Sequence, residues 1–357
     1  MNTDNFIKEL NKELSCVQDY TKEDVFASFE KYVRNKTALR NSVDFGLFFF
    51  DYVHYKGVIE GTVFEDALIE ILDTFEKAFT ANQAGCKRVY QNSYSEICKG
   101  LAGHTQMMWT KSEEKPNRFD VLARELFRDM GQMIEEELQP YISFVQNLQR
   151  IAEGKQPEHF RLGVNVNTLI GKSNCFKIIY KEILQDIPVS QWRNIAYHTN
   201  FKVKNDVAEV WYGSNQVIHR EIAKEDLIMT IETIDTILYL NKTAFTLIGI
   251  DYGQYFDIST EIGEKSNDTR NDDILIQITE SAFAHGYRIL SYDSAKRIII
   301  LDTMNDTPTD NLIRFMQIVA VLIDADFTAR VMTNNVVICD VIYAQSKLSI
   351  IHYSTSK

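Results

Sequence analysis

An arginine, an adjacent amide and a histidine lie within six residues near the middle of the chain: Arg193, Asn194 and His198. Histidine changes its charge near neutral pH, so His198 would serve as a general acid or base. Arginine stays charged and its fork matches a phosphate, so Arg193 would offset the charge of a phosphorane-like transition state. Asn194 adds a neutral donor and acceptor beside them. Because a ribose 2′-hydroxyl lies next to its own phosphate, these groups suffice to cleave RNA without a metal.

The spacing of these residues around a helix bears on how many copies a site needs. At 100° per residue, Arg193 and His198 lie about 140° apart, whereas Asn194 and His198 share a face. One copy of the helix therefore does not bring the arginine and the histidine together in one site. Two copies facing across a two-fold axis would bring two arginines and two histidines to one cleft, because such an interface is self-complementary. We expect a homodimer that associates through this helix.

Helices are expected on both sides of the motif. Residues 173–187 place apolar side chains at helical spacing, and the break at Pro188 separates them from a helix that carries the motif. Residues 203–211 alternate enough to form a short hairpin, with Gly213 at its turn. Residues 225–245 keep an apolar face along their length, which indicates a long amphipathic helix.

The motif and this order of elements resemble the HEPN superfamily of ribonucleases. The family pattern is an arginine, a polar residue that is often asparagine, and a histidine after four to six residues. Here four residues separate Arg193 from His198, and Asn194 fills the polar position. The resemblance covers about residues 120–248. It implies an antiparallel helical bundle, metal-independent cleavage of RNA (transfer RNA is one candidate) without a cofactor, and a dimer with a composite site.

The resemblance also implies a role for each motif residue. His198 would act on the 2′-hydroxyl or the leaving 5′-oxygen, Arg193 would stabilise the phosphate, and Asn194 would position it or hold the histidine tautomer. Three nearby side chains are expected to contact the substrate: Tyr197, Lys202 and Lys204. Many such proteins are bacterial toxins or antiphage defence effectors, held inactive by an inhibitor until a trigger protein or signal arrives.

The charge of the chain favours a second interpretation. Lys and Arg number 38 against 50 Asp and Glu, a net charge of −12, and no Lys/Arg tract is present. Proteins that grip long nucleic acid by its backbone are usually basic on at least one face. A non-catalytic, HEPN-like dimeric scaffold that binds a nucleotide or a protein partner therefore stays open. So does a regulatory component in which the C-terminal region acts and the motif is vestigial.

Other patterns speak for a cytoplasmic protein without a membrane segment, metal or cofactor. The five cysteines are scattered and form no CxxC pair, which is typical of reduced thiols. The first ten residues carry acids and no signal-peptide core. The longest uncharged apolar run, residues 45–50, is too short for a bilayer. Gly171-Lys172-Ser173 is no phosphate loop, because Val166 stands where such a loop needs glycine.

Two acidic groups receive structural interpretations. Asp302, Asp306 and Asp310 straddle an expected strand end, loop and helix start, where Asp is a common cap, so capping is favoured over metal binding. Glu135, Glu136 and Glu137 lie within an expected helix of residues 118–148. They are expected to form a solvated face.

The overall expectation is an α+β fold that is mostly α, in four regions. Residues 1–117 would be a helical N-terminal domain that ends in a polar stretch around Pro116, and residues 118–250 the HEPN-like helical bundle. Residues 251–272 would be a polar linker. Residues 273–357 would form a small α/β domain of unknown role, in αββαβββ order with a largely antiparallel sheet.

Overall fold

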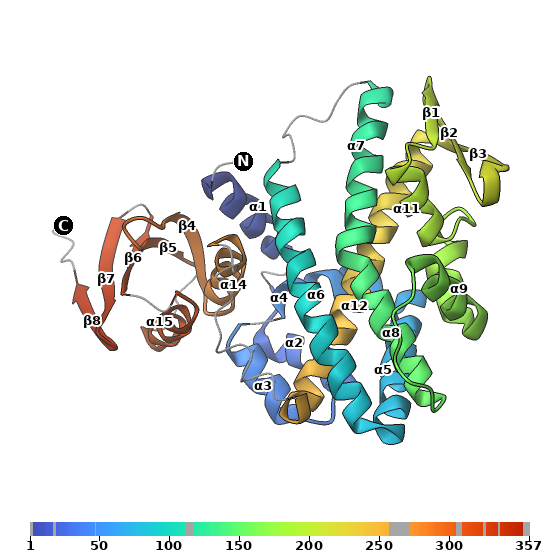
Figure 1. Ribbon diagram of the computed structural model, residues 1–357. Coiled ribbons are helices and arrows are strands. Elements are labelled where there is room, and N and C mark those ends of the chain that lie inside the picture. The colour runs from blue at the N-terminus through green and yellow to red at the C-terminus, as the bar shows by residue number, and fades with distance from the viewer. Residues whose placement is uncertain are drawn as a thin grey trace. The chain divides into compact units, whose positions relative to one another are not determined.

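The computed structural model describes residues 3–16, 19–46, 48–110, 118–256, 271–304, 309–323, 326–334 and 336–352. Its contacts divide the chain into two compact units, which are called unit 1 (Met1–Val53 and Lys265–Lys357) and unit 2 (His54–Glu264). Helices dominate unit 2, and a sheet with helices forms unit 1 (Figure 1). The expected α+β class, mostly α, is confirmed.

Unit 2 is built around a bundle of long helices joined by shorter ones. Contacts join α8 to α5 and α6, and α12 to α5 and α7. The core includes a stack of Tyr90 on Phe245 and Phe256, with ring centroids 4.2 and 4.4 Å apart. The helices are η2 (Tyr55–Ile59), α5 (Val63–Ala81), α6 (Gln83–Thr110), α7 (Phe119–Gln132), η3 (Met133–Leu138), α8 (Gln139–Ala152), α9 (Leu162–Lys172), α10 (Asn174–Lys177), η4 (Ile178–Glu182), α11 (Val189–Tyr197) and α12 (Lys224–Phe256).

The helix expected over residues 118–148 contains a π-helical segment, η3, between α7 and α8. The Gln139 N–H donates to the Ile134 carbonyl, five residues back, and Pro140 follows in the first turn of α8. Proline has no N–H and its ring clashes with the carbonyl four residues before it, so a wider turn relieves the clash. Helix α6 approaches this turn at Gly100, where a Cβ would overlap the Glu136 carbonyl oxygen.

A three-stranded antiparallel sheet lies between α11 and α12 in the chain. It consists of β1 (Phe201–Lys204), β2 (Val207–Tyr212) and β3 (Ile218–Ala223), in that spatial order. The expected hairpin is present, but its turn lies at Asn205 and Asp206. Gly213 instead begins the loop to β3, a strand that was not expected because its first four residues are exposed and do not alternate. Phe201 stacks on Phe127 of α7, with centroids 4.0 Å apart.

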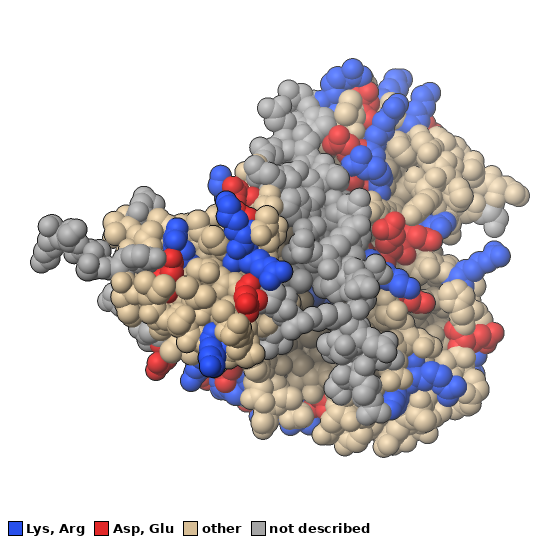
Figure 2. Space-filling model, turned by 60° about the vertical axis from the view of Figure 1, so that its left-hand side comes forward, with Lys and Arg blue, Asp and Glu red and all other residues tan. Residues whose placement is uncertain are grey.

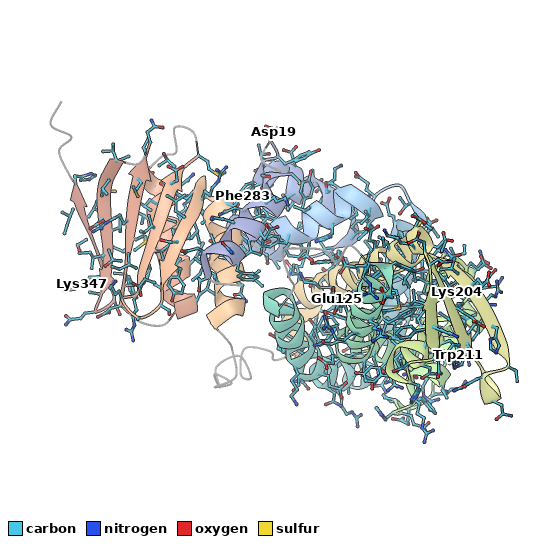
Figure 3. All side chains as sticks on the ribbon, turned by 90° about the horizontal axis from the view of Figure 1, so that it is seen from above. Asp19, Glu125, Lys204, Trp211, Phe283 and Lys347 are labelled. Atoms are coloured by element: carbon cyan, nitrogen blue, oxygen red, sulfur yellow. The ribbon has the colours of Figure 1, made fainter. Side chains whose placement is uncertain are left out.

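Unit 1 combines N-terminal helices with a C-terminal α/β segment. Its five-stranded sheet has the order β4-β5-β6-β7-β8, antiparallel except for the β5–β6 pair, which α15 connects (Figure 3). The expected αββαβββ order is therefore what the structure shows. The elements are α1 (Thr3–Ser15), α2 (Lys22–Phe29), η1 (Glu30–Tyr32), α3 (Lys36–Asp44), α4 (Phe49–His54), α14 (Asn271–Ala284), β4 (Tyr287–Asp293), β5 (Ile298–Thr303), α15 (Thr309–Ile323), β6 (Phe327–Thr333), β7 (Val336–Ala344) and β8 (Lys347–His352).

The two units differ from the four regions expected from the sequence. The boundary expected after residue 117 falls inside unit 2, because α6 packs on α8 and η3. The first helices join the C-terminal segment instead. Asn11 Nδ2 donates to the Ile289 carbonyl at 2.8 Å, and the Phe50 N–H donates to the Glu280 carboxylate at 2.9 Å. Contacts between residues so far apart in the sequence produce no local sequence pattern, so the composition of unit 1 could not be predicted.

Parts of the expected linkers lie outside the described residues. These are residues 111–117 and 257–270, while residues 251–256 of the second linker complete α12. Across the part of the chain that is described, no helix combines the length and the apolarity needed to cross a bilayer.

Candidate active site

The motif lies on α11, a short helix that packing holds in place. Trp192 and Ile195 are fully buried, and the Trp192 indole N–H donates to the Leu184 carbonyl at 3.1 Å. On the side of α7, Gly131 lets α11 come close, since a Cβ there would lie 3.0 Å from the Cβ of Ala196. The outward side chains of α11 are therefore presented by a rigid element.

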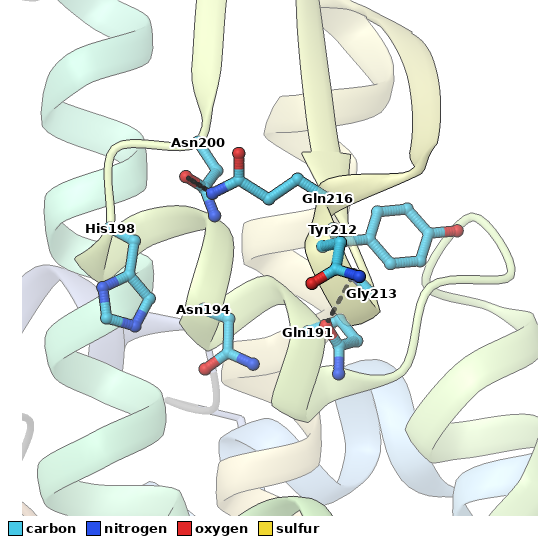
Figure 4. Close-up of a pocket in the computed structure, with 8 residues that line it drawn as sticks. Gln191, Asn194, His198, Asn200, Tyr212, Gly213 and Gln216 are labelled. Atoms are coloured by element: carbon cyan, nitrogen blue, oxygen red, sulfur yellow. Dashed lines mark hydrogen bonds between the residues drawn. The ribbon is translucent and has the colours of Figure 1, made fainter.

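Two stripes of α11 carry the polar side chains. Gln191, Asn194 and His198 follow at spacings of three and four, so they share one face, whereas Arg193 and Tyr197 share the neighbouring face. Figure 4 shows Gln191 and Asn194 projecting from the same side of the helix and His198 at its end. The expected divergence of Arg193 from His198 around the helix is thus what the structure shows.

The helix ends at the catalytic candidate itself. His198 is the C-cap. The Asn200 N–H donates to the Ile195 carbonyl at 2.9 Å, and the Thr199 N–H donates to the Ala196 carbonyl at 3.4 Å. Thr199 has a φ of +52°. This pair of bonds is the Schellman ending of a helix, with a β-branched residue where glycine is usual. The turn leads the chain directly into β1.

A cavity of about 400 Å³ opens beside α11 (Figure 4). It is bounded by the outward stripe of α11 on one side and by the loop between β2 and β3 on the other. The lining is Gln191, Asn194, His198, Asn200, Tyr212, Gly213, Asn215 and Gln216. Two of the three motif residues, Asn194 and His198, therefore face one cavity.

Arg193 lies beside this cavity and does not line it. Its Nε donates to Glu135 Oε2 at 2.6 Å, its guanidinium carbon lies 4.6 Å from the centroid of the Tyr197 ring, and its Nη1 donates to Asn194 Oδ1 at 3.3 Å. The bond to Glu135 raises the pKa of the Arg193 guanidinium above its ordinary value. Arg193 is thus a permanent cation, oriented by Glu135 and linked to the cavity through Asn194.

Tyr197 supports this guanidinium. Partial burial and then the Glu135 and Glu136 carboxylates raise the pKa of its phenol, so the ring stays neutral at physiological pH. Its side chain is 48% exposed beside the motif. Tyr197 is therefore placed both to stack under Arg193 and to reach a ligand.

Lys202 and Lys204 are exposed on the same face of β1 and do not line the cavity. Lys204 and Trp211 mark the small sheet in Figure 3. Lys202 follows His198 by four residues, so the two Cα atoms lie within about 14 Å of each other. The lysines are therefore neighbours of the candidate site without being part of its cavity.

A wider group of cations includes these lysines. Figure 2 shows Lys and Arg gathered at the end of unit 2 where α7 begins, with acids among them. The exposed basic residues of α7, its N-cap and β1, which are called the basic ridge, are Arg118, Arg124, Arg128, Lys202 and Lys204. Two of them have carboxylate neighbours, as Arg118 pairs with Asp120 and Arg128 with Asp129. Three of the five were not singled out in the sequence, since they form no tract.

The expectation of a solvated acidic face holds for only one of three glutamates. Glu136 is exposed, Glu135 pairs with Arg193, and Glu137 is 2% exposed. All three lie in η3, where the wider turn shifts the helical register, so spacing alone could not identify the one that faces the motif. The cavity amides were missed for a different reason, since neutral amides form no motif; the position of Gln191, three before Asn194, was the one available signal.

The structure describes two of the three aspartates singled out in the C-terminal region. Asp302 lies in β5 and Asp310 in the first turn of α15, while Asp306 lies outside the described residues. Among the described residues, no three His, Cys, Asp or Glu side chains are grouped so as to hold a metal ion. Compared with known proteins, the chain matches no family model, no curated protein and no solved structure, so its candidate site is defined by its own geometry.

Proposed function

We propose that unit 2 is a metal-independent endoribonuclease whose catalytic residues are Arg193, Asn194 and His198. One observation carries the proposal: Asn194 and His198 face the same cavity, while the Arg193 guanidinium is held within hydrogen-bond distance of Asn194. The resemblance of the motif to that of HEPN ribonucleases supports the same chemistry.

The chemistry needs only proton transfers and charge stabilisation. His198 takes the proton of a ribose 2′-hydroxyl, the 2′-oxygen attacks the adjacent phosphorus, and the bond from phosphorus to the 5′-oxygen breaks. A histidinium returns a proton to the 5′-oxygen, leaving a 2′,3′-cyclic phosphate and a 5′-hydroxyl. Arg193 offsets the charge that develops on the phosphoryl oxygens. Glu135 accepts from Nε and Asn194 accepts from Nη1, so Nη2 is the donor that would point at the phosphate.

A second copy of the chain would supply the second histidine. The exposed edge of α11 with Tyr197 is the proposed dimer surface, which would place two motifs at one cleft. By resemblance, the dimer would be a toxin or antiphage effector of the cytoplasm that is controlled by an inhibitor or trigger protein.

The basic ridge reconciles RNA binding with the acidic chain. The ridge has five exposed cations on two neighbouring elements. Three of them, Arg124, Lys202 and Lys204, form no ion pair among the described residues that is shorter than 4 Å. These three would provide a local positive path for the RNA backbone, although the net charge of the chain is −12. Each phosphate contact releases counterions, so binding should weaken as salt rises. Lys202 and Lys204 then contact backbone beyond the cleaved bond and not the reacting phosphate.

The test is cleavage of total cellular RNA by purified protein in excess EDTA. We expect His198→Ala to reduce the rate at least about 100-fold, because general acid–base catalysis typically contributes 10²–10⁴-fold. His219→Ala is the matched control, because His219 is an exposed histidine of β3 that pairs with Glu209 and lies outside the cavity. Wild type and control should leave 5′-hydroxyl ends. Equal cleavage by His198→Ala and wild type would contradict the proposal.

The ion pair of Arg193 favours one alternative, a non-catalytic scaffold that binds a nucleotide. An arginine whose Nε is bonded to a carboxylate is also what a purely structural pair would show. In that case neither wild type nor variant cleaves RNA, and Arg193→Ala changes stability without changing nucleotide affinity. The same EDTA experiment, with nucleotide binding measured alongside, separates the two functions.

A further inference from the structure

The cavity beside α11 is unusual in being lined by neutral amides. Five of its eight lining residues are asparagine or glutamine, and none is Lys, Arg, Asp or Glu. The amides come from three segments: α11, the turn between α11 and β1, and the loop between β2 and β3. They are Gln191, Asn194, Asn200, Asn215 and Gln216.

The hydrogen bonds that hold these amides in place use only some of their donors and acceptors. Gln191 Oε1 accepts from the Gly213 N–H at 3.3 Å, and Gln216 Nε2 donates to Asn200 Oδ1 at 3.1 Å. Asn200 is 9% exposed, and its backbone carbonyl accepts from the Trp211 N–H at 3.0 Å. Figure 4 shows the Asn200 and Gln216 amides facing each other above Gln191 and Asn194. Amide donors and acceptors therefore remain for a ligand.

The loop that carries two of the amides is also held in a costly conformation. Asn215 and Gln216 have φ values of +59° and +57°, and they follow Gly213 at +85°. Non-glycine residues with positive φ occur where surrounding structure imposes them and concentrate at functional sites. Gln216 is exposed, so burial of its own side chain does not stabilise this backbone conformation. The loop nevertheless presents Gln216 to the cavity.

The chemistry of the lining selects a class of ligand. A phosphate inside this cavity would bring its negative charge to a wall without Lys or Arg, whereas the edge of a nucleobase is neutral and alternates donors with acceptors. Side-chain amides pair with base edges through two hydrogen bonds at once. A volume of about 400 Å³ falls in the range of small-ligand sites, about 300–1,000 Å³.

We propose that this cavity holds one unstacked nucleobase of RNA, next to the phosphate at which the motif acts. The position follows from Asn194 and His198, which belong both to the motif and to the lining. The inference deepens the proposed ribonuclease function and rests on it for the location of the cleaved bond. It assigns the base preference to Gln191, Asn200 and Gln216, and the salt-dependent backbone affinity to the basic ridge. Base recognition in single-stranded RNA commonly takes this form.

The test measures binding without cleavage. Fluorescence anisotropy is recorded for four labelled trinucleotides of A, C, G or U, each with 2′-fluoro groups in place of the attacking hydroxyls. We expect the wild-type protein to favour one base over the least favoured by about ten-fold or more, because a good bidentate pair contributes that much discrimination. Gln191→Met/Gln216→Met, which keeps the side-chain volume, should bind all four with similar, salt-dependent affinity.

Gln156→Met is the matched control, since Gln156 is an exposed glutamine in the loop between α8 and α9. It should keep the wild-type preference. The single variant Gln191→Met, which leaves the Asn200–Gln216 bond intact, should lose part of the preference and guards against a double variant that fails to fold. Equal affinity of the wild-type protein for all four trinucleotides, or an unchanged preference in a folded double variant, would overturn the inference.

The outcomes separate this inference from the nuclease proposal. A base preference that needs Gln191 and Gln216, in a protein that does not cleave RNA, keeps the base site and removes the catalytic role of His198. Cleavage that needs His198 but cuts after all four bases equally keeps the catalytic role and removes the base site.

Discussion

The three motif side chains lie in two different environments. Asn194 and His198 face the cavity, while Arg193 is turned toward Glu135 on η3 and lies over the ring of Tyr197. The ion pair places a negative charge beside the group expected to bind phosphate. Glu135 therefore both orients Arg193 and opposes an approaching anion, and these two effects act on different kinetic constants.

Replacing Glu135 by Gln should separate these effects. Loss of the charge-assisted bond frees the guanidinium, so we expect kcat to fall about ten-fold, while KM for RNA falls or stays constant because a repulsive charge is gone. Steady-state cleavage of a defined RNA measures both constants. Glu136→Gln is the control, because Glu136 is also a glutamate, follows Glu135 in the chain and is exposed. A Glu135→Gln enzyme with wild-type kcat would show that Arg193 needs no such orientation.

Thr199 holds a left-handed conformation next to His198. A β-branched residue in this region destabilises the folded state by about 1–2 kcal/mol. Glycine adopts the conformation without this penalty, but its greater freedom in the unfolded chain lowers the free energy of unfolding by about 0.5–1 kcal/mol. We expect Thr199→Gly to raise the free energy of unfolding of unit 2 by about 0.5–1 kcal/mol. Urea unfolding followed by tryptophan fluorescence measures it. Thr168→Gly, inside α9, should lower stability instead, as glycine does in a helix interior.

At the scale of elements, the site depends on close approaches that glycine permits. Gly131 admits the end of α11 against α7, and Gly100 admits α6 against the π-helical turn that contains Glu135. The turn itself follows from Pro140. A proline and two glycines on three helices thus set the distance from Glu135 to Arg193.

Gly100→Ala should be strongly destabilising for this reason. Its Cβ would overlap the Glu136 backbone carbonyl, which cannot rotate away as a side chain would, so we expect a loss of about 2–3 kcal/mol. Gly171→Ala in α9 is the matched control, because no atom lies within 4 Å of its added Cβ. That variant should gain about 0.5–1 kcal/mol. Thermal unfolding of both variants gives the comparison, and equal melting temperatures would contradict the packing described here.

Elements with a strong apolar period could be predicted, and those without one could not. The helix expected over residues 225–245 lies within α12, which continues to Phe256, and the strands β4 to β8 follow the expected order. Strand β3 was missed because Ile218 to Glu221 are all exposed, and η3 was missed because a π turn keeps the composition of an α-helix. For the site, Arg193, Asn194 and His198 follow from residue type and spacing. Glu135 and Gln216 do not, because their proximity depends on tertiary packing.

At the scale of the whole molecule, unit 1 contains a titratable pair, a buried histidine and a half-buried lysine. His285 is 1% exposed; its Nδ1 donates to the Ser281 carbonyl at 2.7 Å, and its Nε2 faces Lys22 Nζ at 3.2 Å. Burial first, and Lys22 second, lower the pKa of His285 from 6.5 to about 4. Burial likewise lowers the pKa of Lys22 to about 8, against the nearby Asp44. The imidazole is therefore neutral in the folded unit at physiological pH.

Unit 1 should consequently be sensitive to acid. The unfolded chain binds the His285 proton below about pH 6.5 and the folded unit only below about pH 4, so the contribution of His285 to stability is full above pH 6.5 and is lost as pH falls between these values. The loss is on the order of 3 kcal/mol. Hydrogen exchange of unit 1 amides at pH 7 and pH 4.5 measures it, and His285→Gln should remove most of the difference. Tryptophan fluorescence is the internal control, because Trp109, Trp192 and Trp211 all lie in unit 2.

The composition of unit 1 from two distant stretches of chain has a consequence during translation. Its first helices leave the ribosome before unit 2 is made, and α14 and the sheet leave after it. At 5–20 residues per second, the interval is on the order of 10–40 s. For that time Phe49, which is 2% exposed in the finished protein, lacks its partner Phe283 of α14, and α1 lacks the strand β4 on which it packs. Unit 2 is thus synthesised while unit 1 is incomplete, and apolar side chains of the first helices stay exposed until α14 and β4 emerge.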